Sequence, residues 1–290
     1  MKLGFFLAGV NPRHYLTIAK RADELGYESV WMPEHLVFPA SIGSSHPYAG
    51  PGAENFNPDT PSYDPFVVMG HVAAVTKHVK LGTGVYILPL RNPFVTARSA
   101  VTVDVLSEGR MLLGVGIGWL KNEFLAVGET WENRGARSVE IAQILRRLWS
   151  EETIAHQGKY YKFDAVKFRP KPKNPNGIPL LFGGVTPPAI ERAAQAGEGW
   201  FGVRHSLEEA TEIIGRLKAH RAKLGLGDRP FEITVGCPPP VTVEHIRAYE
   251  KAGVHRMMVT PWGPPQGRLT PEHLVSGLEQ FANDVLAKVK

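Results

Sequence analysis

The sequence predicts an α/β fold in the form of a closed (β/α)8 barrel, and three observations lead to this prediction. Eight short apolar segments alternate with amphipathic segments along the 290 residues. Strict alternation requires a parallel sheet, because a helix then makes each return crossover. A barrel of this type uses about 250 residues as one domain. We therefore expect residues 1–290 to form a single (β/α)8 domain.

The predicted elements follow one another in a regular order. The strands are expected at residues 2–7, 29–33, 79–86, 110–115, 179–182, 199–203, 231–236 and 256–260. Apolar residues at helical spacing predict helices near 12–25, from 64 onward, and at 92–106, 134–149, 187–196, 207–224, 243–252 and 271–289. Asp64 and Pro65 are typical of a helix start, with an acidic N-cap followed by proline in the first turn.

Two segments interrupt this order. Residues 36–63 carry Pro, Gly, Ser and Asn without periodicity. So long a loop is uncommon inside a compact domain and is usually functional, so we expect a lid after the second strand. Residues 151–168 alternate apolar and polar residues, which predicts a hairpin inserted before the fifth strand.

Composition excludes several classes of protein and site. The net charge of +5 comes from scattered residues, and the densest basic group, residues 168–173, is broken by prolines, which argues against a nucleic-acid partner. A single cysteine, Cys237, excludes a disulfide framework and favours a cytoplasmic protein. The chain contains no long apolar run typical of a membrane span. Metal-binding spacings such as CxxC and HExxH are also missing, so we expect no metal centre.

The residues that follow the second predicted strand are Glu34 and His35. In a barrel the loops after the strands meet at one face, where active sites are built. Histidine beside an acid can transfer protons there, because imidazole titrates near neutral pH. A loop histidine bonded to the backbone is the alternative interpretation.

Glycines mark the ends of the third and fourth predicted strands. Gly84 and Val85 follow a Gly-Thr pair, and Ile117, Gly118 and Trp119 follow a second glycine-rich run. Glycine within a strand often marks a bulge or the close approach of a flat group to the backbone. Close packing against a bulky residue is the other interpretation. The second run is not a dinucleotide-binding fingerprint, because its third glycine falls one place early.

The fifth predicted strand ends in a loop suited to an anion. Gly183, Gly184, Val185 and Thr186 precede a helix whose start provides unbonded N–H groups and the positive end of the helix dipole. This loop is our candidate for a phosphate site, with an ordinary turn capped by Thr186 as the alternative. Trp262 follows the last strand and is a weaker candidate, with Trp119, for contact with a substrate.

Taken together, these motifs resemble the luciferase-like monooxygenase superfamily, and within it the oxidoreductases that use the deazaflavin coenzyme F420. The resemblance covers nearly the whole chain. It includes residues 2–5, 31–35, 81–93, 109–119 and 182–187. Within the family, sugar-phosphate dehydrogenases place a glutamate where this chain has Trp119, so we do not expect a sugar phosphate as substrate.

The resemblance implies a role for each candidate residue. Glu34 and His35 match the acid–histidine pair beside the flavin or deazaflavin ring of the cofactor, with His35 as the proton-transfer residue. Gly84-Val85 matches a bulge that is typically a non-proline cis peptide against the central ring. Positions along the ring are implied for Ile117 and Gly118. Residues 183–186 match the phosphate loop.

The resemblance also leaves the cofactor open. It implies hydride transfer between F420 and a small organic substrate, with the redox chemistry supplied by the cofactor. The alternatives are a monooxygenase that uses reduced FMN and oxygen, and a barrel that binds flavin without catalysis. Members of the family are usually homodimers, and a reductase that supplies reduced flavin or F420 is the expected redox partner.

Overall fold

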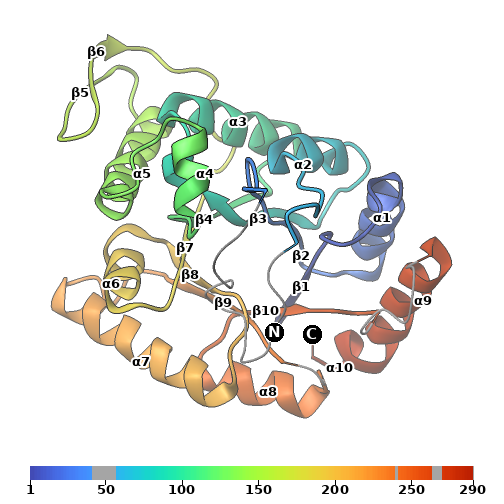
Figure 1. Cartoon of the computed structure of the whole chain (residues 1–290). Helices are drawn as coiled ribbons and strands as arrows, with labels where there is room; N and C mark the ends of the chain where they lie inside the picture. Colours follow the sequence, from blue (N-terminus) through green and yellow to red (C-terminus); the bar gives the residue numbers. More distant parts are fainter. Residues whose placement is uncertain (41–56, 239–240, 263–269, 290) are drawn as a thin grey trace.

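The computed structural model describes residues 1–40, 57–238, 241–262 and 270–289. Eight parallel strands close into a barrel, as the sequence predicts (Figure 1). They are β1 (Lys2–Phe6), β2 (Ser29–Met32), β3 (Lys80–Ile87), β4 (Met111–Gly116), β7 (Leu180–Gly183), β8 (Gly199–Gly202), β9 (Glu232–Gly236) and β10 (Arg256–Val259). The barrel closes where β1 pairs with β10, Lys2 lying opposite Arg256.

Helices surround this barrel in chain order (Figure 1). They are α1 (Tyr15–Leu25), α2 (Pro65–Ala73), α3 (Pro93–Leu106), α4 (Lys121–Ala126), α5 (Arg134–Ser150), α6 (Pro187–Ala196), α7 (Leu207–Lys223), α8 (Val243–Ala252), α9 (Pro271–Phe281) and α10 (Ala287–Val289). Two differ from the predicted elements. The short helix α4 was not predicted, and the last predicted helix is interrupted by a π-helical segment, Ala282–Leu286, between α9 and α10.

The predicted start of α2 is confirmed in atomic detail. The Asp64 carboxylate accepts hydrogen bonds from the N–H groups of Phe66 (2.9 Å) and Val67 (3.0 Å), and Pro65 occupies the first turn. These bonds satisfy two donors that a helix start leaves unpaired.

The predicted hairpin is also present, as strands β5 (Ile154–Gln157) and β6 (Lys162–Val166), which project from the ring of helices (Figure 1). Glu140 on α5 anchors it. The carboxylate accepts a bond from the N–H of Tyr161 (2.8 Å) and lies 3.1 Å from Nε2 of His156.

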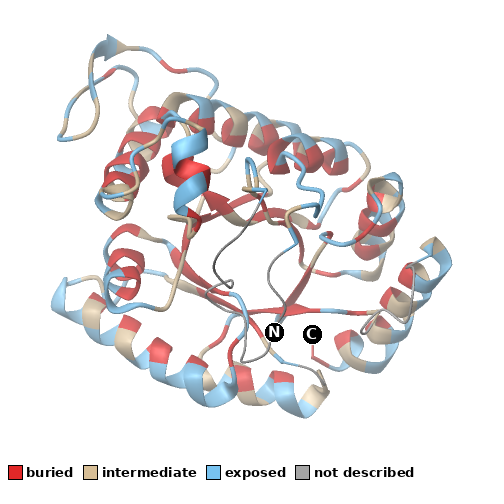
Figure 2. Ribbon diagram, in the orientation of Figure 1, coloured by how far each residue is buried: buried red, intermediate tan, exposed pale blue. Residues whose placement is uncertain are grey.

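The two largest clusters of buried side chains form the core of the barrel. The larger cluster lies between the barrel and the helices, and the strands and the inward helix faces are buried in Figure 2. A second cluster contains residues of seven strands: Trp31, Leu112, Leu181, Phe201 and Met258, with Phe6 and Val85 packed against them. Side chains from seven strands can meet only in the barrel interior. The lumen is therefore filled with side chains, and the functional face is the rim above it.

A buried arginine closes the opposite, amino-terminal end of the barrel. Arg256 is fully buried, and its guanidinium donates to Glu28 (2.6 and 2.7 Å), to Glu232 (2.8 Å) and to the Thr234 hydroxyl (3.0 Å). Burial alone would raise the pKa of Glu232, but Arg256 and Lys2 outweigh it and lower this pKa to about 2. The pair is ionised at neutral pH and stabilises the closed end.

Candidate functional site

His35 follows β2 at the rim and is held by a glutamate that the sequence analysis did not single out. Its Nδ1 lies 2.9 Å from Oε2 of Glu123, a residue of α4 whose side chain is fully buried. Aromatic rings enclose the imidazole. The Trp119 ring lies edge-on at 5.9 Å and the Phe38 ring is tilted at 4.7 Å. His35 thus has an acid partner and an apolar setting, which is the environment of a proton-transfer residue.

The backbone of His35 is tied to the far end of the long β2 loop. The Ser62 hydroxyl accepts a bond from the N–H of His35 (3.0 Å) and donates to its carbonyl oxygen (2.9 Å). Both ends of the predicted lid therefore meet beside the candidate catalytic residue. The middle of the predicted lid, residues 41–56, lies outside the described residues.

Glu34 is buried and bound to protein groups. Its Oε1 accepts bonds from the N–H of Ile87 (2.7 Å) and from the guanidinium of Arg91 (2.7 Å), which also pairs with Oε2. Arg91 stacks over the Tyr86 ring at 4.5 Å. Burial raises the pKa of Glu34 to about 6, against the opposing effect of Arg91. The contacts seen for Glu34 thus fix the end of β3.

The end of β3 carries the predicted bulge. Its register with β4 shifts between Thr83 and Tyr86, and the Gly84–Val85 peptide bond is cis, as the resemblance implied. A Cβ at Gly84 would lie 2.7 Å from the Phe6 ring. The Val85 side chain lies 3.4 Å from the position a Cβ would take at Gly183. The structure therefore brings Gly84, Val85 and Gly183 to one part of the rim.

Ile117, Gly118 and Trp119 leave the end of β4 and form the wall beside His35. Gly118 has φ +77°, and a Cβ there would lie 2.7 Å from Phe124 and 2.9 Å from Ile87. Since Phe124 follows Glu123 on α4, the helix that holds His35 also packs against this wall. Ile117 and Gly118 are half-buried, so both remain partly accessible at this side of the rim.

The loop after β7 keeps part of its predicted anion-binding character. The N–H groups of Val185 and Thr186 have no acceptor within the described part of the chain, whereas the Gly184 carbonyl accepts a bond from Trp200 (2.8 Å). The start of α6 offers fewer N–H donors to an anion than the sequence analysis predicts. Residues 187 and 188 at the start of α6 are prolines without N–H groups, and Ala189 donates to the Thr186 carbonyl (2.9 Å). An anion here would be bound mainly by the loop, with the helix dipole adding to it.

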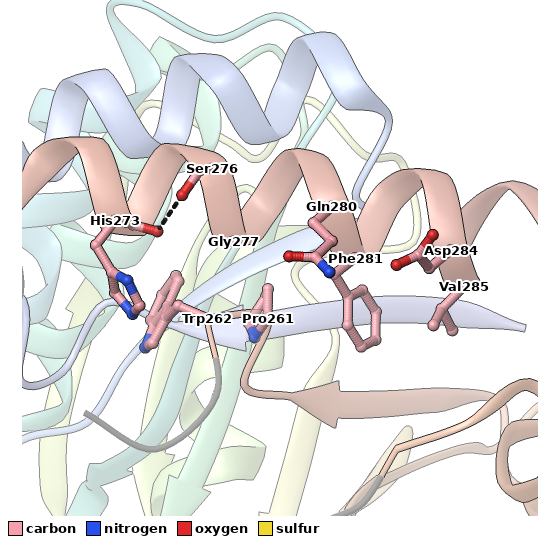
Figure 3. Close-up of a pocket in the computed structure, with 9 residues that line it drawn as sticks. All are labelled: Pro261, Trp262, His273, Ser276, Gly277, Gln280, Phe281, Asp284 and Val285. Atoms are coloured by element: carbon pink, nitrogen blue, oxygen red, sulfur yellow. Dashed lines mark hydrogen bonds between the residues drawn. The ribbon is translucent and has the colours of Figure 1, made fainter. Parts of the chain in front are cut away.

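Trp262 is not brought to this cluster. Its ring packs edge-on against Phe5 at 5.4 Å, and its backbone lies 2.7 Å from the position a Cβ would take at Gly277 on α9. It lines a cavity of about 390 Å³ together with Pro261 and residues of α9 and the π-helical segment that follows it (Figure 3). The weak sequence prediction that Trp262 contacts the substrate has no support from this position, because Phe5 belongs to the layer between barrel and helices.

The remaining features concern Cys237, groups of possible metal ligands and membrane-spanning helices. Burial raises the pKa of Cys237 to about 11, and its sulfur lies 3.4 Å from that of Met257, so the thiol is poorly suited to nucleophilic chemistry. Among the described residues, no three His, Cys, Asp or Glu side chains are grouped as metal ligands require. The described helices include none with the length and apolar character to span a bilayer.

Two important site residues, Glu123 and Arg91, were missed. A signal for Arg91 exists, because a buried acid such as Glu34 needs a cation and Arg91 follows the neighbouring strand. The signal for Glu123 is weaker, since α4 has only six residues and little periodicity.

Comparison with known proteins identifies the family. The sequence profile of the luciferase-like monooxygenases matches residues 1–273. The chain belongs to the luciferase-like monooxygenase family. It is therefore an oxidoreductase, as the resemblance implied.

Individual relatives agree with this assignment. An uncharacterised protein of Mycobacterium tuberculosis is 31% identical over the full length of both chains. An F420-dependent glucose-6-phosphate dehydrogenase of Amycolatopsis mediterranei is 32% identical over 193 residues, 65% of this chain and 53% of that enzyme. The crystal structure of monooxygenase RslO1 from Streptomyces bottropensis superposes with a TM-score of 0.78 over both whole chains at 21% identity, which supports the barrel fold.

Proposed function

We propose that this protein transfers a hydride between coenzyme F420 and a small organic substrate. The observation that carries the proposal is the pairing of His35 with the buried Glu123 beside a glycine-lined rim. The similarity to an F420-dependent dehydrogenase supports the choice of cofactor. When bound, F420 supplies the hydride donor or acceptor.

The residues at the rim fit a flat cofactor with a phosphate. The glycines at 116, 118 and 183 let the backbone of the rim pack closely on its neighbours, since a Cβ would lie 2.7 Å from Val85 at Gly116, 2.7 Å from Phe124 at Gly118 and 3.4 Å from Val85 at Gly183. The Gly84-Val85 bulge lies among them. The N–H groups of Val185 and Thr186 are available for the phosphate. Ile117 and Gly118 would lie along the ring. Glu34 would act through the end of β3, which it holds in place.

The surroundings of His35 favour an apolar substrate. Trp119 and Phe38 enclose the imidazole, and Leu36 and Val37 are 40% and 42% exposed beside it. Trp119 stands where the sugar-phosphate dehydrogenases of the family carry an acid. An alcohol or ketone of low polarity suits this lining, with His35 holding or accepting the proton of its oxygen.

Some expectations from the sequence and from the resemblance remain proposals. They are a single-domain chain that works as a homodimer in the cytoplasm, together with a reductase that regenerates the cofactor. An FMN-dependent monooxygenase is the second candidate function, because the matched family is named for monooxygenases.

A turnover assay with separate arms tests the proposal. In one arm, purified protein is mixed anaerobically with oxidised F420 and a panel of secondary alcohols. A parallel aerobic arm contains reduced FMN, oxygen and the corresponding ketones. F420 reduction that depends on an alcohol supports the proposal, whereas product formed only with FMN and oxygen favours the monooxygenase. Binding of oxidised cofactor without turnover in either arm indicates a non-catalytic flavin-binding barrel.

The His35→Ala variant tests the role of the histidine in the active arm. We expect kcat to fall by about 10²–10⁴-fold, the usual contribution of general acid–base catalysis. Cofactor affinity should stay nearly unchanged, because His35 is assigned to the substrate proton. Unchanged turnover would remove His35 from the scheme.

A further inference from the structure

The Glu123 carboxylate binds two consecutive residues of the β2 loop. Its Oε2 lies 2.9 Å from Nδ1 of His35, and its Oε1 accepts a bond from the N–H of Leu36 at 2.8 Å. The side chain is fully buried, and within the described residues His35 is the ion-pair partner found for it. Both oxygens therefore act on one dipeptide at the rim.

With Glu123 ionised, this geometry determines which ring nitrogen of His35 carries a proton. An ionised carboxylate can only accept hydrogen bonds. A donor must then stand at Nδ1, so neutral His35 is held as the Nδ1–H tautomer and its lone pair is on Nε2. The neighbouring acid does not compete for this role, because both oxygens of Glu34 are bound by Arg91 and the Ile87 N–H.

We propose that Glu123 is the positioning residue of the site, which fixes the tautomer of His35 so that Nε2 exchanges the substrate proton. The proposal rests on the proposed function for its catalytic meaning, although the tautomer itself can be measured without cofactor or substrate. Glu123 also fixes the direction of the ring, since the Leu36 bond ties the same carboxylate to the backbone that follows His35.

The Glu123→Gln variant is a sharp perturbation, because it keeps the shape and removes one acceptor. An amide offers one oxygen for the two donors, His35 Nδ1–H and Leu36 N–H. If the oxygen stays on Leu36, the amide NH₂ faces Nδ1 and stabilises the opposite tautomer. If the oxygen turns to His35, two donors face each other at Leu36. The first arrangement avoids this conflict, so we expect the tautomer to switch.

The matched control is Glu140→Gln. Glu140 is also nearly buried, also lies next to a histidine, His156, and also accepts backbone N–H groups, but it lies in the hairpin anchor. This variant also removes a carboxylate that bonds a histidine ring and backbone N–H groups. It should leave the His35 ring unchanged.

The experiment is long-range ¹H–¹⁵N NMR of the histidine rings in the full-length protein, with the His35 signals assigned by their loss in His35→Ala. We expect Nδ1-protonated His35 in the wild type and in Glu140→Gln, and a switch to Nε2 protonation in Glu123→Gln. Wild-type His35 in the Nε2–H form overturns the proposal, and so does an unchanged tautomer in a folded Glu123→Gln protein. If Glu123→Gln does not fold, the tautomer of His35 in the wild-type protein decides whether the proposal holds.

Turnover measurements add the catalytic part. In the active arm of the assay, Glu123→Gln should lower kcat by about 10²–10⁴-fold with little change in KM. Glu123→Asp should recover part of this loss. Glu140→Gln should keep the wild-type kcat. Normal turnover in a Glu123→Gln protein with a switched tautomer refutes the positioning role. Absence of turnover in every arm, with the expected tautomer present, counts against the proposed function instead.

Discussion

Two glycines that share a backbone conformation provide a direct test of the site wall. Gly118 and Gly128 have φ values of +77° and +75°. A Cβ at Gly118 would lie 2.7 Å from Phe124 and 2.9 Å from Ile87, whereas a Cβ at Gly128 would meet no atom within 4 Å. Alanine at either position carries the left-handed backbone penalty of about 1–2 kcal/mol. Only Gly118→Ala adds overpacking.

The expected difference can be estimated from this contrast. Overpacking in a tight site costs about 1–3 kcal/mol, so Gly118→Ala should lose about 2–5 kcal/mol in total. For a chain of this size, each kcal/mol lowers Tm by about 2 °C. We expect a fall of about 4–10 °C for Gly118→Ala and about 2–4 °C for Gly128→Ala, measured by circular dichroism. Equal shifts in the two variants would contradict the close packing of Phe124 on the wall.

Two further predictions concern the buried charges. Arg91→Met leaves Glu34 without its cation, and breaking such a pair costs about 3–5 kcal/mol of unfolding free energy at neutral pH. The loss of stability should be smaller below the Glu34 pKa of about 6, where the carboxyl is protonated, and adding Glu34→Gln to Arg91→Met should relieve the loss. Urea unfolding at about pH 5 and pH 7 measures this pH dependence. An equal loss at both pH values would refute the prediction. Glu232 has a pKa lowered to about 2 from 4.5, so it contributes up to about 3 kcal/mol above pH 4.5 that is lost as the pH falls toward 2. Glu232→Gln should therefore be less stable than wild type at neutral pH and converge on it in acid, and a gap that does not depend on pH would show that the pair with Arg256 is not the cause.

The barrel could be predicted because its signals are local and repeated. Each strand is a short apolar run, and each helix has an apolar stripe, so the alternation survives small errors at the element ends. The rim glycines were identified for a related reason, since glycine at the end of a strand such as β3 or β4 has few structural explanations.

The rest of the site depends on contacts distant in sequence. Glu123 reaches His35 across 88 positions, and nothing in the six residues of α4 marks the acid as buried. The position of Trp262 depends on how α9 packs against the barrel, which periodicity does not specify. The two prolines at the start of α6 are visible in the sequence. The prediction of an anion site relied on the N–H groups that helix starts usually offer and did not subtract the two that proline lacks.

The central claim is that the rim binds a flat redox cofactor through the glycine wall and the loop at 183–186. A calorimetric titration of the wild-type protein with oxidised F420, and separately with oxidised FMN, tests it most directly. We predict saturable binding of one F420 per chain, weakened in Gly118→Ala and retained in Gly128→Ala. Absence of binding by both cofactors, or equal binding in the two glycine variants, would contradict the account.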